Sequence, residues 1–436
     1  MIKTLPGFRE FWPEDCSRRN FIFSQWRAVA RRFAFREYDG PILEPLELYQ
    51  EKSGEEIREQ LFAFTDKGGR EVALRPEMTP TLARMVASRY NGLPKPVKWF
   101  SIGEHFRYER YQKGRKRSFY QFNADLLGEA GPAAEIELIA LLIESLRAFG
   151  LGGEDFAIRL SDRTLWLHFL QGEGFSAGDS LRILTVVDKL EREPAGVLGE
   201  KLANLTGADG MALLEKIRRF AGLQSLAAIR DFFAAAGNEE STRERLEEWE
   251  FLLRGLRAMG LEEFIVVDLG IVRGLAYYTG FVFEAFDREK SHRALAGGGR
   301  YDQLLGKLGK VDCPAVGFAV GDVVLENVLT EKGRMPPLVQ AIDFFVIGLG
   351  EGDRSAVWQV VGLLRSSGWL VDYTLKGPGG MKKQFKAADD AGARYALLIG
   401  EEERANNQVK LKNLATREET VLSASRLLEE LARVVG

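Results

Sequence analysis

The sequence predicts a mixed α+β protein that contains a helical insertion and ends in a small α/β domain. Three observations lead to this prediction. Residues before position 162 and after position 264 alternate between runs of period two, typical of strands, and runs of helical period. Residues of about 162–257 have helical periodicity almost throughout and are rich in Ala, Leu, Glu and Arg. After the proline-marked segment EKGRMPPL, strands alternate with helices over about 100 residues, as in an open α/β sheet.

Length and composition fit this organisation. A chain of 436 residues corresponds to two or three domains at ~150 residues each. We expect two units, residues 1–335, which contain the insertion, and residues 336–436. The apolar share of 45% and the charged share of 28% are ordinary for a soluble globular protein. The net charge of −3 is weak evidence against nucleic-acid binding, because local basic clusters matter more than the total.

The cysteine and histidine content argues against a metal site held by protein side chains. Cys16 and Cys313 lack metal-type spacing, so we expect two reduced thiols, as in a cytosolic protein. The three histidines form no HExxH motif and no His/Cys cluster. The N-terminus has no basic segment followed by an apolar run, and no apolar run is long enough to cross a bilayer. We therefore expect a soluble, cytoplasmic protein without a membrane partner.

The N-terminal third predicts a helix, a strand, a hairpin and a second helix. Residues 1–17 are rich in turn-forming residues, and an amphipathic helix follows over residues 18–35. The segment GPILEPLELY has Pro41 at the start of an extended run, as an edge strand would. The hairpin turns at residues 67–69, and the next helix has Glu77 and Thr79 near its start. On this segment alone, the Thr-Pro pair favours the interpretation of a plain helix start.

The most informative stretch is VKWFSIGEHFRYERYQKGRKRSFYQFNADLLG, residues 97–128, which predicts two strands joined by a basic loop. Strand alternation puts an aromatic ring, two amides and a carboxylate on one face of the second strand: Phe119, Gln121, Asn123 and Asp125. Buried polar groups need partners, and a ligand would supply them. The loop has a donor-rich set suited to phosphates: Arg110, Lys113, Arg115, Lys116 and Arg117. A surface hairpin with a solvated basic tip is the alternative interpretation.

Polar motifs return after the helical insertion. The segment FIVVDLGIVRGLAYYTGFVFEAF has two strand-like runs around Arg273, Tyr277 and Tyr278, which offer a carboxylate clamp beside aromatic rings. An edge-strand arginine with core tyrosines would have the same pattern. In ALAGGGRYDQLL, three glycines precede Arg300 and Tyr301 and permit close approach of a ligand or of another strand. A buried strand, PAVGFAV, then leads into a helix.

The C-terminal segment carries one basic feature. Its predicted strands are FFVIGL, WLVDYTL, YALLIG and VKLKNL, and helices are expected over residues 354–366, 380–390 and 423–434. One helix has a predicted basic face: Lys382, Lys383, Gln384 and Lys386. Such a face is usually only solvated, although it is also suited to contact RNA.

Taken together, these segments resemble the histidyl-tRNA synthetases of class II. GPILEPLELY resembles the family's dimer-forming motif 1, and the hairpin of residues 97–128 resembles motif 2. IVRGLAYYTGFVFE and AGGGRYD resemble two motifs of the family's histidine site, and LKGPGGMKKQFKAADDAGARYALLIGEEE resembles its anticodon-binding domain. The resemblance implies a six-stranded antiparallel sheet with flanking helices, a homodimer, and a C-terminal α/β domain of doubly wound type that binds the anticodon.

The resemblance also implies roles for single residues. Arg107 and Arg273 would be catalytic and would bind the α-phosphate of ATP together with the carboxylate of histidine. Glu109 would bind the adenine amino group and Phe119 would stack on the adenine ring. The remaining histidine-binding residues would be Glu77, Thr79, Gln121, Asp125, Tyr277, Tyr278 and Tyr301. Gln112, Arg115 and Arg117 would contact the acceptor end of the tRNA.

The chain departs from the family pattern at three positions. The carboxylate that faces the imidazole is usually glutamate and here is Asp125, and Ala276 replaces an aspartate in the usual RGLDYY. The motif 3 pattern GLER has an arginine near ATP, where this chain has Val324. We expect compensation by Mg²⁺, by Arg300 or by an arginine of the basic loop.

The function implied is ATP-dependent activation of L-histidine and its transfer to tRNA-His, with Mg²⁺ bound to ATP. A second hypothesis is a non-catalytic, histidine-sensing paralogue like the regulatory subunit of ATP phosphoribosyltransferase, which the changed motif 3 favours. The anticodon-type domain and the retained Arg107, Glu109 and Arg273 oppose it. A third hypothesis, an RNA-binding regulator without activity, agrees only with the change in motif 3.

Overall fold

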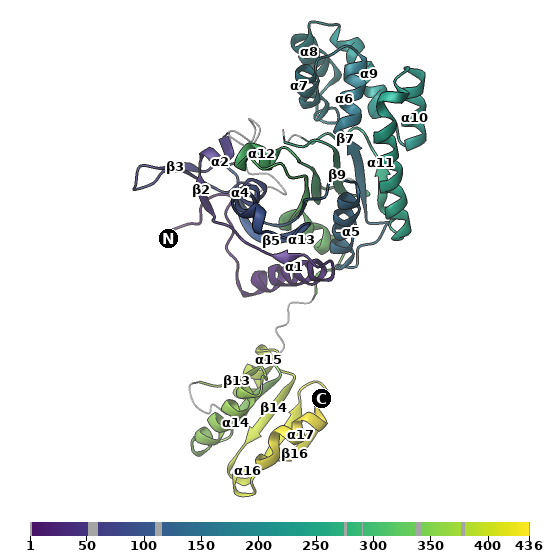
Figure 1. Ribbon diagram of the computed structural model, residues 1–436. Helices are drawn as coiled ribbons and strands as arrows, with labels where there is room; N and C mark the ends of the chain where they lie inside the picture. Colours follow the sequence, from purple (N-terminus) through teal and green to yellow (C-terminus); the bar gives the residue numbers. More distant parts are fainter. Residues whose placement is uncertain are drawn as a thin grey trace. The chain divides into compact units, whose positions relative to one another are not determined.

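The computed structural model describes residues 2–50, 60–109, 116–273, 277–289, 291–336, 342–375 and 380–435. The chain forms two compact units, Met1–Pro336 and Pro337–Gly436 (Figure 1). Each unit has its own sheet and its own hydrophobic core.

The first unit consists of helices packed around one large sheet. Its helices are α1 (Pro13–Arg32), α2 (Glu47–Gln50), α4 (Thr79–Arg89), α5 (Ala133–Arg147), α6 (Arg163–Gly172), α7 (Ala177–Val187), α8 (Ala195–Thr206), α9 (Gly210–Ala221), α10 (Leu226–Ala235), α11 (Glu239–Ala258), α12 (Leu304–Gly309) and α13 (Asp322–Glu331). Its strands are β1 (Arg36–Glu37), β2 (Leu43–Pro45), β3 (Ala63–Thr65), β4 (Glu71–Leu74), β5 (Val97–Phe106), β6 (Ser118–Leu127), β7 (Phe156–Asp162), β8 (Ile265–Val267), β9 (Phe281–Asp287), β10 (Ala296–Arg300) and β11 (Ala315–Gly321).

The large sheet has the strand order β1-β5-β6-β11-β10-β9-β7-β8. The six inner strands, from β5 to β7, pair antiparallel throughout, which confirms the expected antiparallel sheet. The short edge strands β1 and β8 pair in parallel and extend the sheet to eight strands. Strands β2, β4 and β3 form a separate small antiparallel sheet, whose β3–β4 hairpin turns at the predicted glycines.

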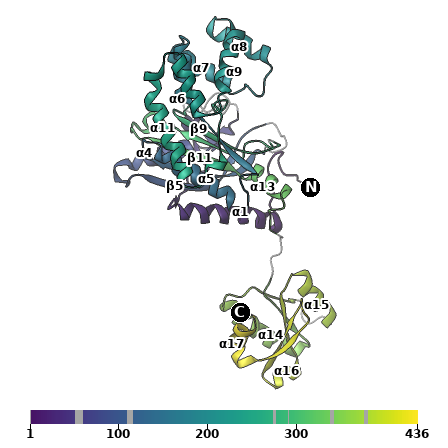
Figure 2. The ribbon, with the colours of Figure 1, turned by 90° about the vertical axis from the view of Figure 1, so that its right-hand side faces the viewer.

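The predicted hairpin of residues 97–128 is formed by β5 and β6 at the centre of this unit. Alternation sends Phe122, Ala124 and Leu126 into the main hydrophobic core, where the Trp26 ring of α1 stacks on Phe122 at 5.5 Å between ring centroids. Helices α1 and α5 therefore cover this face of the sheet (Figure 2). The polar row of β6 lies on the opposite face, as a two-residue period requires.

The first helix begins earlier than the sequence predicts. Helix α1 starts at Pro13, within the segment expected to be turns, and ends at Arg32. Proline is well suited to the first turn of a helix, because its missing N–H has no intrahelical partner there. Asp15 reinforces the start by accepting a hydrogen bond from the backbone N–H of Trp12 at 3.3 Å.

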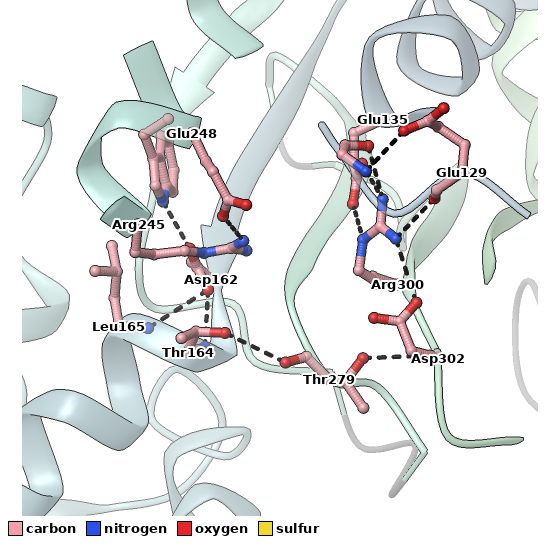
Figure 3. Close-up of polar contacts among 12 residues, drawn as sticks. Glu129, Glu135, Asp162, Thr164, Leu165, Arg245, Glu248, Thr279, Arg300 and Asp302 are labelled. Carbon is pink, nitrogen blue, oxygen red and sulfur yellow. Dashed lines mark hydrogen bonds and ion pairs between the residues drawn. The ribbon is translucent and has the colours of Figure 1, made fainter. Parts of the chain in front are cut away.

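The predicted helical insertion consists of helices α6 to α11, which gather at one end of the first unit (Figure 1). Its base is fixed by the buried carboxylate of Asp162, which caps α6 through the backbone N–H of Thr164 at 2.7 Å. Asp162 also accepts hydrogen bonds from Arg245 Nε at 2.5 Å and Trp249 Nε1 at 2.7 Å, both on α11 (Figure 3). One carboxylate thus joins the first and last helices of the insertion to the sheet.

The second unit is a mixed α/β sheet with helices on both faces. Its elements are β12 (Phe344–Gly348), α14 (Arg354–Ser366), β13 (Val371–Tyr373), α15 (Met381–Asp390), β14 (Tyr395–Ile399), α16 (Glu401–Ala405), β15 (Gln408–Asn413), β16 (Glu419–Ser423) and α17 (Leu427–Val434). Strands β13, β12 and β14 are parallel, whereas β15 and β16 are antiparallel additions, so the sheet is only partly of the doubly wound type. Helices α14 and α17 pack on one face and α15 on the other.

One expectation for this unit is wrong. Gln384 does not belong to a basic face of α15, because its side chain is buried and donates a hydrogen bond to the backbone O of Gly348 at 2.8 Å. The exposed lysines Lys382, Lys383 and Lys386 remain on the outer side of the helix. Across the described residues of both units, no helix combines the length and the apolar character that a membrane span requires.

Candidate active site

A cavity of about 260 Å³ lies over the polar face of β6 and its neighbours β11 and β10. The register aligns Asn123 of β6 with Ala319 of β11, and Ala319 in turn with Gly297 of β10. Small residues on β10 and β11 leave room above the sheet, while long polar side chains rise from the elements around it. Ten residues predicted from the sequence line the cavity: Glu77, Thr79, Arg107, Glu109, Phe119, Gln121, Arg273, Tyr277, Tyr278 and Tyr301.

Asp125 lies beneath the cavity and is bound by Tyr301. Tyr301 donates its hydroxyl hydrogen to Asp125 Oδ1 at 2.6 Å, and both side chains are almost fully buried. Burial raises the pKa of the Asp125 carboxyl to about 7, although the Tyr301 hydrogen bond opposes the shift. Gly317 faces Asp125 on the adjacent strand, and a Cβ there would come within 2.0 Å of Oδ1. The glycine is therefore required for the carboxylate to lie flat against β11.

A second tyrosine–carboxylate pair closes another wall of the cavity. Tyr277 donates a hydrogen bond to Glu77 Oε2 at 2.7 Å, and both residues are buried. Glu77 lies two residues before Thr79, where α4 begins, and Pro80 is in the first turn of this helix. Burial raises the pKa of Tyr277 well above its ordinary value, and the Glu77 charge adds to this effect. Tyr277 is therefore a permanent donor near neutral pH, and it holds Glu77 toward the cavity.

Arg273 lines the cavity and is held there by a partly buried ion pair with Glu284 of β9. Burial alone would lower the pKa of Arg273, but Glu284 and Tyr278 raise it overall, so the guanidinium stays charged. Arg273 has a φ of +58°, a left-handed conformation that is costly outside glycine and that is concentrated at functional sites. Its Nε is buried without a partner among the described residues, as is the Nδ2 of Asn123. A bound anion or polar ligand would satisfy these donors.

Gly297 makes room for the Arg273 guanidinium. A Cβ at this position would lie 2.2 Å from Arg273 Nη1. The glycines before Arg300 were expected to permit close approach of a ligand or of another strand, whereas at Gly297 the group that comes close is a side chain of the same chain. The guanidinium consequently lies over the backbone of β10.

Arg107 follows β5 and lies over the face of Phe119. Its Nε donates a hydrogen bond to the backbone O of Pro76 at 3.0 Å, and its Cζ is 5.2 Å from the Phe119 ring centroid. The other neighbour of Phe119 is His105, whose ring stacks on it at 6.0 Å between centroids. Burial lowers the pKa of His105 well below its ordinary value, and Arg75 and Arg107 lower it further. His105 is therefore neutral and adds no charge to the cation-rich wall.

Of the three residues expected at the tRNA acceptor end, the structure describes only Arg117. Gln112 and Arg115 lie outside the described residues, as do Arg110 and Lys113 of the same loop and Ala276 of the RGLAYY segment. Arg117 is described but lies away from the cavity, with its Cζ 4.0 Å from the Tyr108 ring centroid.

Val324, at the expected motif 3 arginine position, lines the cavity and supplies no charge. The expectation that Arg300 compensates is wrong. Arg300 is buried, and its guanidinium donors bind Glu135, Asp302 and the backbone oxygens of Glu129 and Gly131 at 2.6–3.2 Å (Figure 3). A guanidinium has five N–H donors, and these contacts use them all. Arg300 therefore stabilises the fold and has no donor left for a phosphate.

Four residues that line the cavity were given no individual role from the sequence: Lys116, Asn123, Arg293 and Asp322. The period-two pattern of β6 placed Asn123 on the same face as Gln121. Arg293 precedes the glycine-rich motif but belongs to no motif that the sequence analysis used. Asp322 accepts hydrogen bonds from Arg9 Nη2 at 2.7 Å and from the backbone N–H of Tyr120 at 2.9 Å. It therefore anchors the N-terminal segment to the start of α13.

Comparison with known proteins agrees with this architecture. The family model described as histidyl-tRNA synthetase matches residues 7–323, and the model described as anticodon binding domain matches residues 343–433. The chain is 54% identical over 420 residues to the histidine–tRNA ligase of Opitutus terrae, covering 96% of this chain and 95% of that protein. It is 37% identical over 421 residues to the chloroplastic/mitochondrial histidine–tRNA ligase of Arabidopsis thaliana, covering 97% of this chain and 85% of that protein.

Solved structures support the same fold. The structure of histidyl-tRNA synthetase from a Nostoc species has a TM-score of 0.80 at 24% identity and covers 99% of both chains. A Bacillus halodurans protein described as an ATP phosphoribosyltransferase regulatory subunit/histidyl-tRNA synthetase has a TM-score of 0.72 at 21% identity, covering 92% of this chain and 98% of that one. At these identities the likeness concerns the fold alone. The family-model match and the identity over nearly the whole chain show that the chain belongs to the histidyl-tRNA synthetase family.

Proposed function

We propose that this protein is a histidine–tRNA ligase that activates L-histidine with ATP and transfers it to tRNA-His. The observation that carries the proposal is the cavity itself. It combines two buried tyrosine–carboxylate pairs, Tyr301–Asp125 and Tyr277–Glu77, with the cations Arg107 and Arg273. Carboxylates suit the imidazole and amino groups of histidine, and guanidinium groups suit its carboxylate and the phosphates of ATP.

In the first step, an oxygen of the histidine carboxylate attacks the α-phosphorus of ATP. The bond to the β-phosphate breaks, and histidyl-adenylate and pyrophosphate form. Arg107 and Arg273 bind the carboxylate and the α-phosphate and stabilise the charge that develops between them. The step needs no protein nucleophile, because positioning and electrostatic stabilisation lower its barrier.

The remaining site residues orient the two substrates. Glu77, Thr79 and Gln121 hold the α-amino group, while Asp125 and Tyr278 bind the imidazole and Tyr301 closes its pocket. Phe119 stacks on the adenine, and Glu109 accepts a hydrogen bond from the adenine amino group. A pocket built for ring N–H groups rejects isosteres that lack them, because its own polar groups would then be unpaired.

In the proposed reaction, Mg²⁺ binds together with ATP. Among the described residues, no group of three or more His, Cys, Asp or Glu side chains is arranged to hold a metal ion. Magnesium commonly keeps several waters and binds through substrate phosphates. When bound, it neutralises phosphate charge. Of the cavity carboxylates, Asp322 is engaged by Arg9, and Glu77 by Tyr277.

In the second step, a hydroxyl of the terminal ribose of tRNA-His attacks the histidyl carbonyl and AMP leaves. We assign Gln112, Arg115 and Arg117 to the acceptor end and residues 336–436 to the anticodon, with residues 1–335 as the catalytic unit. We also propose a homodimer formed through the segment that contains Pro41, and a cytoplasmic location, where ATP and tRNA substrates are available.

The histidine-sensing alternative is less well supported. The full-length identity is to proteins named histidine–tRNA ligase, and the C-terminal unit matches the anticodon-binding family model. The cavity also retains Arg107, Glu109 and Arg273, which a histidine sensor does not require.

The proposal is tested by exchange of labelled pyrophosphate into ATP with each of the twenty amino acids. Exchange with histidine alone, followed by charging of tRNA-His, is expected. If the folded protein binds histidine without exchange, the sensing function replaces the ligase function.

A further inference from the structure

Arg293 is a positively charged residue that lines the cavity and lies outside the sequence motifs described above. It lies on the connection between β9 and β10 and lines the cavity together with Val323 and Val324. Its side chain is exposed at the cavity mouth, and no hydrogen bond or ion pair joins its guanidinium to another described residue. An uncommitted guanidinium at the mouth of an anion-binding cavity is available to a ligand.

The backbone on both sides of Arg293 is fixed. Before it, Asp287 accepts hydrogen bonds from the N–H groups of Ser291 at 2.8 Å and His292 at 3.1 Å, and His292 Nε2 lies 2.7 Å from Glu331 Oε2. After it, the N–H of Leu295 donates to the backbone O of Ala285 at 2.8 Å. Arg293 is therefore presented from an ordered backbone, which lowers the entropic cost of binding.

The same connection is bonded to the start of α13. The N–H of Gly321 donates to the backbone O of Leu295 at 3.4 Å, and Ala296 pairs with Val320. Gly321 precedes α13, which carries Val324 in its first turn. Arg293 and Val324 thus come from two segments that are hydrogen-bonded to each other at the edge of the cavity.

The other described arginines in or near the cavity are already engaged. Arg273 pairs with Glu284, Arg107 donates to Pro76, and Arg9 pairs with Asp322. Arg300 has no free donor, as described above. The triphosphate of ATP brings several negative charges, and Arg107 and Arg273 are assigned to its α-phosphate, so the outer phosphates need a further cation.

We propose that Arg293 binds the β- and γ-phosphates of ATP and supplies the positive charge that Val324 lacks. This inference rests on the proposed function insofar as ATP is the substrate. The planar guanidinium donates two parallel N–H bonds to phosphate oxygens. The contact holds the leaving pyrophosphate in line with the bond that breaks at the α-phosphorus.

The first test compares binding of ATP and of AMP to wild-type protein and to Arg293→Ala by isothermal titration calorimetry. We expect Arg293→Ala to weaken ATP binding by about 10- to 100-fold, the usual range for a charge-assisted contact, and AMP binding by less than about 2-fold. In pyrophosphate exchange, the KM for ATP rises and the KM for histidine is unchanged. Equal losses for ATP and AMP, or no loss for either, would overturn the proposal.

Two further variants make the test specific. Arg288→Ala is the matched control, because Arg288 lies on the same connection but donates to the backbone oxygens of Gly153 and Glu263. It is expected to leave ATP affinity unchanged. Lys116→Ala tests the lining cation that, unlike Arg107 and Arg273, has not been assigned to the α-phosphate. A selective loss of ATP binding in Lys116→Ala, with none in Arg293→Ala, would assign the outer phosphates to Lys116 instead.

A rescue experiment separates a ligand contact from a structural effect. Val324 is only partly buried, so Val324→Arg is sterically tolerable. Adding it to Arg293→Ala should restore ATP affinity by at least about 10-fold, because a cation returns to the same edge of the cavity. If the double variant does not fold, Arg293→Lys replaces it in the test. Because lysine keeps the positive charge, Arg293→Lys should retain part of the ATP affinity that Arg293→Ala loses. If wild-type protein exchanges pyrophosphate normally and Arg293→Ala equals it, this inference fails while the proposed function stands.

Discussion

Tyr301 and Asp125 are 176 positions apart in the chain, yet the Tyr301 hydroxyl donates to Asp125 Oδ1 at 2.6 Å inside the first unit. The pairing of β6 with β11, and of β11 with β10, brings them together, since Tyr301 directly follows β10. Each group depends on the other. Burial raises the pKa of Asp125, and Tyr301 provides the donor that makes the ionised form tolerable.

The first prediction concerns the pH dependence of stability. The pKa of Asp125 rises from the ordinary 3.8 to about 7 on folding, so the folded protein binds this proton more tightly than the unfolded chain. The stability linked to Asp125 is therefore complete below about pH 4 and is lost as pH rises to about 7. The free energy of unfolding of Asp125→Asn, taken relative to that of the wild type, should therefore increase by roughly 2–4 kcal/mol from pH 4.5 to pH 8. Urea unfolding at the two pH values measures this difference. An unchanged difference at the two pH values would contradict the shift.

Tyr301→Phe provides the control for this prediction. Loss of the hydroxyl removes the contact that opposes the shift, so the pKa of Asp125 should rise further and the transition should move above pH 7. A transition that moves to lower pH would show that Tyr301 does not stabilise the carboxylate.

The second prediction concerns the catalytic role of Arg273. Arg273→Ala should reduce pyrophosphate exchange by about 10³-fold, because the guanidinium stabilises charge that develops only in the transition state. Circular dichroism should remain that of the wild type. The matched control is Arg254→Ala, since Arg254 is exposed on α11, outside the cavity lining, with its Cζ 5.7 Å from the Phe251 ring centroid. Near-normal exchange by Arg273→Ala would reject the assignment.

The third prediction uses two neighbouring glycines with different surroundings. A Cβ at Gly297 would meet the Arg273 guanidinium at 2.2 Å, and a side-chain terminus can move aside. A Cβ at Gly298 would meet the backbone O of Gly317 at 2.5 Å, which cannot move without disturbing the sheet. Gly297→Ala should therefore lose exchange activity and keep its melting temperature, whereas Gly298→Ala should lower the melting temperature. The reverse pattern would refute the proposed packing of Arg273.

The fourth prediction concerns the attachment of the helical insertion. Asp162→Ala leaves Arg245 and Trp249 Nε1 without their buried acceptor, so we expect a loss of roughly 3–5 kcal/mol in the free energy of unfolding. Glu248→Ala removes the more exposed partner of Arg245 and should cost less than about 1 kcal/mol. Urea unfolding of both variants measures the difference. Equal losses would show that Asp162 is not the main anchor.

The Asp162 network also reaches the cavity. Thr164 Oγ1 donates to the backbone O of Thr279 at 3.3 Å, and Thr279 follows Tyr277 and Tyr278 of the cavity wall (Figure 3). Thr279 Oγ1 in turn accepts from the N–H of Asp302 at 3.3 Å, next to Tyr301. We therefore expect Asp162→Ala to raise the KM for histidine as well. A loss of stability confined to the helical insertion would leave this KM unchanged.

The sequence by itself determined the local elements and the faces of the strands. A period of two put Phe119, Gln121, Asn123 and Asp125 on one face of β6, and the structure agrees. Helical periodicity likewise located the insertion, because the spacing of apolar residues along one element depends on that element alone. The glycines before Arg300 were also informative, since lack of a Cβ has the same meaning in any fold.

Only the tertiary structure decided which distant side chains meet. The tertiary fold brings Glu77 to Tyr277 and Asp125 to Tyr301. It also directs Arg300 toward Glu135 and places Arg293 at the cavity. Local periodicity contains no information on the order of strands in a sheet, and the direction of an arginine depends on which carboxylates the fold brings within reach. For this reason periodicity and motifs predicted which residue types surround the site, whereas Arg300, one of the three groups considered for the compensating charge, is a residue that the fold uses for its own stability.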